Sequence, residues 1–225
     1  MSGRLHSLVL GLMVAGLGFV PADLRAQNSN EPTTLEGTVT SIVTKGKSTT
    51  IKVTDAGGNE YDYPITPKLD LEILAKGDDG FLAEGVVVKI DATESNEHFF
   101  GTQFDVYPQF SGRVPVAKAV KAPPKPGQSQ SLHFISGEIV KLEDIPDGKY
   151  DLLHLKGPGK QSLQVYVEPN HRVRVILTDP KSIKESQSVT VTGRAAGQRF
   201  LASKISINTG ETLKGAEFLP TLDKK

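Results

Sequence analysis

The 225-residue sequence contains no cysteine and no tryptophan, and only 6% of its residues are aromatic. The missing thiols exclude disulfides and cysteine-ligated metals, so packed cores must supply the stability. Lysine and arginine together number 26, as do aspartate and glutamate, which gives a formal net charge of zero. A balanced charge and a hydrophobic content of 37% indicate an ordinary globular protein rather than a disordered polyanion.

Long apolar runs are also missing, apart from one at the N-terminus. The run from Leu8 to Val20 follows Arg4 and precedes small residues, and it is shorter than the roughly 20 residues of a membrane-spanning helix. It predicts that residues 1–26 are a signal peptide cleaved after Ala22 or Ala26. We therefore expect an exported protein, periplasmic or extracellular, with no transmembrane segment in the mature chain.

Two stretches of the sequence, about 100 residues apart, repeat one another. Gly37 aligns with Gly137, Val39 aligns with Ile139, and the correspondence continues through four further segments with two small gaps. A spacing this long, with only two copies, favours duplicated domains over a solenoid. The sequence predicts β-domains at 33–110, called copy one below, and at 132–213, called copy two.

The segment between the copies, residues 111–131, has a different composition. It carries four prolines and four basic residues but no acidic one. Proline fixes φ and removes a backbone donor, so this segment is predicted to be an extended linker that completes no sheet. Residues 214–225 are expected to be a C-terminal tail.

Within each copy, apolar and polar residues alternate with the period of two that is typical of strands. The longest non-strand inserts are predicted at 71–84 and 177–187, the second with Asp179 as a helix N-cap before Pro180. Five strands are expected per copy, at 37–43, 49–55, 60–66, 85–93 and 99–107 and at 137–142, 150–156, 163–168, 188–195 and 200–207.

Each copy resembles the small OB-fold modules of exported bacterial proteins. The resemblance rests on a glycine in the first strand, at Gly37 and Gly137, and on a V-x-V-x-G fourth strand at residues 189–193. Copy one departs from it, since Asp91 stands where copy two has Thr192. The resemblance implies an all-β protein of two tandem five-stranded OB-like barrels. Two small β-sandwich domains are the alternative.

Catalytic and metal-binding motifs are missing. The four histidines after residue 26 lie in no catalytic motif, and the sequence has no H-x-x-x-H or H-E-x-x-H pattern. Asp78, Asp79 and Gly80 lack the spaced acidic ladder of a calcium loop. We expect no enzymatic activity, no cofactor and no metal.

The two copies differ in charge. Copy one has 6 basic and 13 acidic residues, whereas copy two has 11 basic and 9 acidic residues. On one predicted strand, Arg172 and Arg174 of copy two correspond to Asp70 and Glu72 of copy one. This difference predicts a site for an anionic or sugar-like group on copy two, formed by Tyr166, Arg172, Arg174, Lys156 and Lys160.

These observations favour an exported, non-enzymatic binding or interaction protein. Its partner would be another protein, an anionic small molecule or an envelope polymer. Nucleic acid is a poor candidate, because strand parity points Tyr61, Tyr63, Phe99 and Phe104 inward rather than toward stacked bases. A metal-independent hydrolase, or an accessory subunit of one, with a site between the domains is one alternative. A structural envelope component whose domains tumble partly independently is another.

Overall fold

The computed structural model describes residues 32–222 apart from 125, 127, 128, 130, 147, 160, 197 and 198. Twelve strands of the described chain are joined in one hydrogen-bonded sheet, so the all-β class is confirmed. The predicted signal peptide lies outside the described residues, and no described helix is long and apolar enough to cross a membrane. The elements are β1 (Thr33–Lys45), β2 (Ser48–Asp55), β3 (Glu60–Ile65), β4 (Asp70–Gly77), η1 (Asp79–Phe81), β5 (Val87–Ser95), β6 (His98–Tyr107), β7 (Lys118–Lys121), β8 (Leu132–Glu143), β9 (Asp151–Lys156), β10 (Ser162–Leu177), η2 (Pro180–Ser182), β11 (Ser188–Ala196), β12 (Arg199–Leu213) and α1 (Gly215–Leu222).

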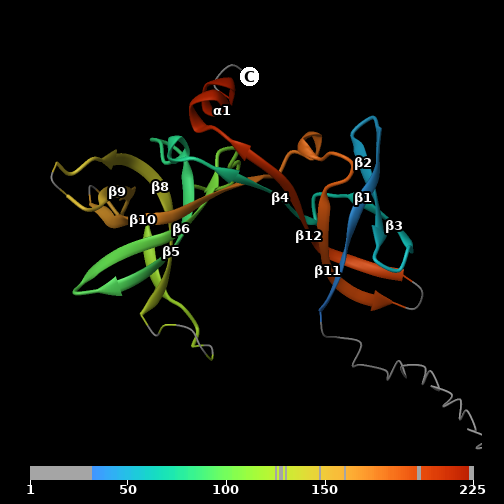
Figure 1. Ribbon diagram of the computed structural model, residues 1–225, viewed down its shortest axis with the longest axis horizontal. Coiled ribbons are helices and arrows are strands. Elements are labelled where there is room, and N and C mark those ends of the chain that lie inside the picture. Colours follow the sequence, from blue (N-terminus) through green and yellow to red (C-terminus); the bar gives the residue numbers. More distant parts are fainter. Residues whose placement is uncertain are drawn as a thin grey trace, which may run out of the picture.

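Five strands close into a barrel. Strand β8 pairs with β9, β9 with β10, β10 with β6, β6 with β5, and β5 again with β8. Apolar side chains at alternate positions fill its interior, and Ile90, Phe104, Leu153 and Val165 are each 0% exposed. This closed barrel forms the left side of Figure 1.

The other side of the molecule is a half-barrel with the strand order β3-β2-β1-β11-β12. Its interior holds Val39, Ile51, Val191 and Ile205, all 0% exposed. Strand β12 continues the sheet by pairing in parallel with β4 from Asp70 onward, and no pair joins the described residues of β3 to β12. We call this unit the open half-barrel.

Strands are exchanged between the two copies. In the closed barrel, β8, β9 and β10 come from copy two, but β5 and β6 come from copy one. In the open half-barrel, β1, β2 and β3 come from copy one, but β11 and β12 come from copy two. The structure therefore differs from the expected tandem arrangement, in which each copy would build its own barrel.

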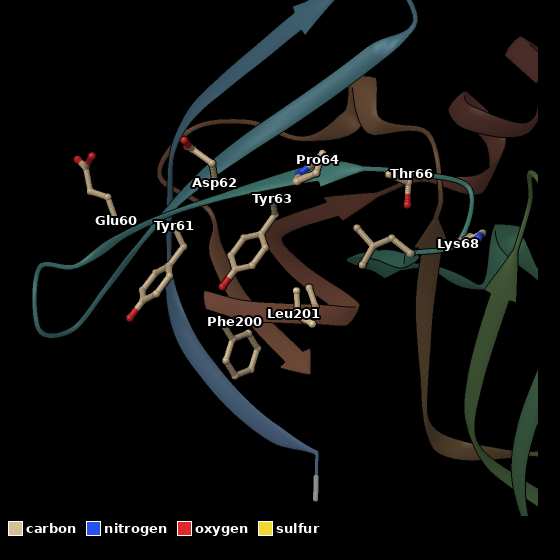
Figure 2. Close-up of a pocket in the computed structure, with 11 residues that line it drawn as sticks. Glu60, Tyr61, Asp62, Tyr63, Pro64, Thr66, Lys68, Phe200 and Leu201 are labelled. Atoms are coloured by element: carbon tan, nitrogen blue, oxygen red, sulfur yellow. The ribbon is translucent and has the colours of Figure 1, made fainter. Parts of the chain in front are cut away.

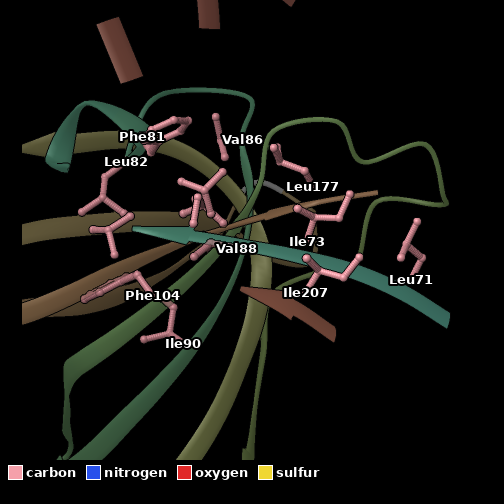
Figure 3. Packing of buried hydrophobic residues seen from close by; sticks show 14 of the residues in the cluster. Leu71, Ile73, Phe81, Leu82, Val86, Val88, Ile90, Phe104, Leu177 and Ile207 are labelled. Atoms are coloured by element: carbon pink, nitrogen blue, oxygen red, sulfur yellow. The ribbon is translucent and has the colours of Figure 1, made fainter. Parts of the chain in front are cut away.

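The two units share one hydrophobic core. The C-terminal half of β10 pairs antiparallel with β4, from Val173 opposite Gly77 to Leu177 opposite Ile73. Ile73 and Ile207 belong to the same buried cluster as Val88 and Phe104 of the closed barrel, and Figure 3 shows part of this cluster. This continuous core differs from the expectation of domains that tumble partly independently.

The predicted linker contributes a strand. Residues Lys118–Lys121 form β7, which pairs antiparallel with β8. The prediction that residues 111–131 complete no sheet was wrong, because the prolines flank this short segment and leave its own donors intact. As an outer strand carrying lysine at each end, β7 has the features of a protected sheet edge.

The segments predicted as inserts and tail are also structured. Residues 71–77 of the first insert lie in β4, whereas the second insert contains η2. The N-cap Asp179 of η2 accepts a hydrogen bond of 3.0 Å at Oδ1 from the Lys181 amide. The tail forms α1, and its Phe218 ring packs 5.8 Å from that of Phe81. The Gly215 amide donates to Asp78 Oδ1 at 2.8 Å.

Candidate functional site

A cleft of about 740 Å³ opens between β3 and β12. Figure 2 shows the side chains of β3 above it and those of β12 below it. Its volume lies in the usual range for ligand pockets. The lining residues are Glu60, Tyr61, Asp62, Tyr63, Pro64, Thr66, Lys68, Leu69, Phe200, Leu201 and Ala202.

The cleft exists because the ladder between β3 and β12 is missing. In the closed barrel the equivalent strands pair from Tyr166 opposite Phe100 onward. In the open half-barrel the residue equivalent to Tyr166 is Pro64, which has no backbone N–H. Proline within a strand is confined to positions where no ladder donor is needed, mainly on edge strands. Pairing between β4 and β12 begins only at Asp70 opposite Lys204, beyond the cleft.

Tyr63 forms the buried wall of the cleft. Its ring extends from β3 toward β12 and is stacked with that of Tyr61, with a centroid distance of 6.3 Å. The residue is only 4% exposed, and its hydroxyl has no hydrogen-bond partner among the described residues. Burial raises the pKa of Tyr63 to about 12, so the phenol stays protonated at physiological pH.

The outer rim of the cleft is acidic. Glu60 and Asp62 are exposed on the face of β3 opposite the tyrosines. Glu60 is paired with Lys52 at 2.9 Å, whereas no ion pair is present for Asp62 in the described part of the chain. Lys68 lies at the far end of the cleft. The site thus combines an apolar wall, one unpaired buried hydroxyl and a negatively charged edge.

Arg174, which was predicted to bind a ligand, forms an ion pair with Asp105. Its Nε donates to Oδ1 at 2.9 Å and its NH2 group donates to Oδ2 at 2.6 Å. The Asp105 side chain is 10% exposed and accepts a third bond from Gln103. The strand parity was correct, but the guanidinium is committed to a carboxylate of β6 and is not free for an anion.

The other residues of the predicted site are dispersed. Arg172 is exposed without a partner in the described structure, Lys156 is paired with Glu138 at 3.1 Å, and Lys160 lies outside the described residues. Tyr166 and Arg174 pair with Phe100 and Asp105, which are five residues apart on β6, roughly 17 Å along an extended strand. The structure therefore does not bring Tyr166 and Arg174 into one pocket.

Tyr166 belongs instead to an aromatic cluster on the outside of the closed barrel. Its ring is stacked with that of Phe100 at 5.3 Å, and the rings of Tyr150 and His98 meet it edge-on at 6.2 and 5.4 Å. All four side chains are at least partly exposed. The outward orientation of Tyr166 agrees with the sequence prediction.

His171 and Asp78 make structural contacts. His171 Nε2 lies 2.7 Å from Asp79 Oδ1, and its ring packs edge-on against Phe104. Asp78 holds the first residue of α1, as described above. No group of three or more potential metal-ligating side chains occurs within the described residues.

In comparisons with known proteins, no family model, no curated protein and no solved structure matches this chain. Sequence reasoning assigned Tyr61 and Tyr63 correctly to the inner face but did not identify the opening beside them. Pro64 within a strand was the available signal, because it indicates a missing ladder partner.

Proposed function

We propose that this protein is a non-enzymatic binding protein that holds its ligand in the cleft between β3 and β12. We further propose that both units are variants of the OB-type barrel and that the mature protein acts outside the cytoplasm, after removal of the expected signal peptide. Fold alone does not assign function, so the proposal depends on the site itself.

The observation that carries this proposal is the hydroxyl of Tyr63. A buried polar group without a partner costs about 1–3 kcal/mol, and most such groups in folded proteins are paired. A ligand that accepts a hydrogen bond from this hydroxyl recovers that cost only when it is bound. The adjacent rings of Tyr61 and Phe200 supply apolar contact area for the same ligand.

The test is a fragment screen by thermal shift, with each hit located by chemical-shift perturbation and compared in Tyr63→Phe and Tyr61→Phe. Hits that use the cleft should bind Tyr63→Phe about 3–10-fold more weakly, the effect of one lost hydrogen bond. The free Tyr63→Phe variant should be more stable than the parent. Hits that map away from the cleft, or that bind Tyr63→Phe as tightly as the parent, would contradict the proposal.

One constellation supports a second candidate, a hydrolase whose site lies on the closed barrel and not, as the sequence-based alternative expected, between the domains. Ser162 Oγ lies 3.5 Å from His154 Nδ1, and His154 Nε2 lies 3.1 Å from Glu143 Oε2. This is the order nucleophile, base and orienting carboxylate. Turnover of a generic ester that Ser162→Ala abolishes would favour this candidate, and turnover unchanged by that substitution, or none at all, would exclude it.

A further inference from the structure

The strands that border the cleft both have free edges. Strand β3 pairs with β2 on one side only and stands at one end of the sheet order. Across the cleft, residues 200–202 of β12 pair with β11, and no described strand pairs with their other side. Unpaired N–H and C=O groups of this kind are a template for an added strand.

The charged side chains along this edge indicate which side chains an added strand would need. Glu60 and Asp62 occupy alternate positions on the outer face of β3, and neighbouring residues on the same face of a ladder interact directly. A strand laid beside β3 would therefore place its outer side chains next to Asp62, which has no ion pair among the described residues, and next to Glu60, which is paired with Lys52. Its inner side chains would face Tyr61 and Tyr63, where apolar groups fit.

We propose that the cleft binds an extended peptide segment of a partner protein, with basic residues alternating with apolar ones, which adds to β3 as an extra strand. This inference rests on the proposed function and names the class of its ligand. Backbone hydrogen bonds to β3 supply affinity, and the acidic rim selects the sequence.

The probe is the acetylated and amidated peptide Lys-Val-Lys-Val-Lys-Val. One control peptide replaces every lysine with glutamate, and another carries N-methyl groups on alternate backbone nitrogens. The lysine peptide should bind at least about tenfold more tightly than either control, because the first control reverses the rim contacts and the second removes ladder donors. Bound peptide should also slow amide hydrogen exchange at residues 60–63 by about tenfold or more.

Variants of the full chain distinguish the effect of the carboxylates on β3 from the effect of the protein's total charge. Asp62→Lys should weaken the lysine peptide about fivefold or more, since it converts a favourable pair into a repulsive one. Asp144→Lys changes the same charge at an exposed position outside the cleft lining and should leave the affinity within about twofold.

Several results would overturn this inference. They are no binding of the lysine peptide, equal binding of the N-methylated control, or protection that appears elsewhere than β3. Concentration-dependent self-association that protects residues 60–63 without peptide would assign the edge to a second copy of this chain instead. If a small molecule binds with dependence on Tyr63 while no peptide does, the proposed function stands and the peptide inference fails.

Discussion

The closed barrel and the open half-barrel repeat one strand pattern but end differently. In the closed barrel, Val165 is 0% exposed within a filled interior, and Tyr166 next to it pairs with Phe100. At the equivalent positions of the open half-barrel, the larger Tyr63 stands in place of Val165, and Pro64 supplies no donor to a ladder. Two neighbouring substitutions thus accompany the change from a sealed barrel wall to a cleft.

Each unit has one parallel ladder with an ion pair across it, but the positions of the basic and acidic side chains are reversed between the two ladders. In the closed barrel, Arg174 of β10 is paired with Asp105 of β6. In the open half-barrel, the acidic side chains are on β4, and Lys204 of β12 lies 2.7 Å from Glu72 and 3.7 Å from Asp70. Each ladder joins strands of different copies.

This inversion favours the exchange of strands between the copies. If each copy kept its own strands in the same register, Asp105 would lie opposite Glu72 and Lys204 would lie opposite Arg172. Like charges directly opposite one another destabilise a ladder. The charge difference between the copies therefore favours pairing between them, and we infer that it selects the exchanged arrangement over the sequential one.

The largest effect is expected from Arg174→Asp. It leaves the mostly buried Asp105 facing another carboxylate, and breaking a buried pair costs about 3–5 kcal/mol. Because the Arg174 side chain is 42% exposed, we expect a smaller loss of about 2–3 kcal/mol in the free energy of unfolding, measured in urea.

Arg172→Asp is the matched control, since Arg172 has the same parity but no partner among the described residues. It should change the free energy of unfolding by less than about 0.5 kcal/mol. Adding Asp105→Arg to Arg174→Asp should recover part of the loss. Equal losses for the two arginine variants would show that the ladder charge does not matter.

The sequence predicted local features of this fold better than long-range ones. Alternation correctly assigned the inner face to Tyr63 and Phe104 and the outer face to Tyr166, because strand parity is a local property. Alternation could not show which strands pair with one another. Strands β5 and β11 have the same pattern of apolar residues, so the pattern alone does not show that β1 pairs with β11. The charge difference was visible in the sequence, but it was interpreted as a ligand site because the pairing of Arg174 with Asp105 spans 69 residues.

The first-strand glycines offer the next largest contrast. A Cβ on Gly37 would lie 2.5 Å from the Thr54 carbonyl oxygen, whereas one on Gly137 would lie 3.0 Å from the Ala117 Cβ. Since a backbone atom yields less readily than a side chain, Gly37→Ala should cost about 2–3 kcal/mol and Gly137→Ala about 1 kcal/mol or less. Urea unfolding of both variants measures the difference, and a larger cost at Gly137 would contradict the assigned packing.

Closing the cleft by substitution should have a smaller effect of the opposite sign. Pro64→Tyr combined with Leu201→Phe copies Tyr166 and Phe100 of the closed barrel. The restored donor and the aromatic pair should stabilise the protein by about 1 kcal/mol and slow hydrogen exchange in β3. The same variant should lose cleft ligands. Unchanged exchange would indicate that Tyr63, rather than Pro64, keeps the strands apart.

The smallest effect concerns Asp91 of the closed barrel, whose equivalent in the open half-barrel is Thr192. Burial, and then the charge of Asp105, raise the pKa of Asp91 above its usual value of 3.8. The folded state therefore holds the proton more tightly than the unfolded state, so ionised Asp91 destabilises the fold at neutral pH, and this penalty disappears as the pH falls below the unfolded pKa. Asp91→Thr should stabilise the protein at pH 7 by less than about 1 kcal/mol, and Asp91→Asn should act similarly. Unfolding free energies at pH 7 and near pH 3 test this: the gain of Asp91→Asn should vanish in acid, whereas a gain that persists would arise from packing rather than from charge.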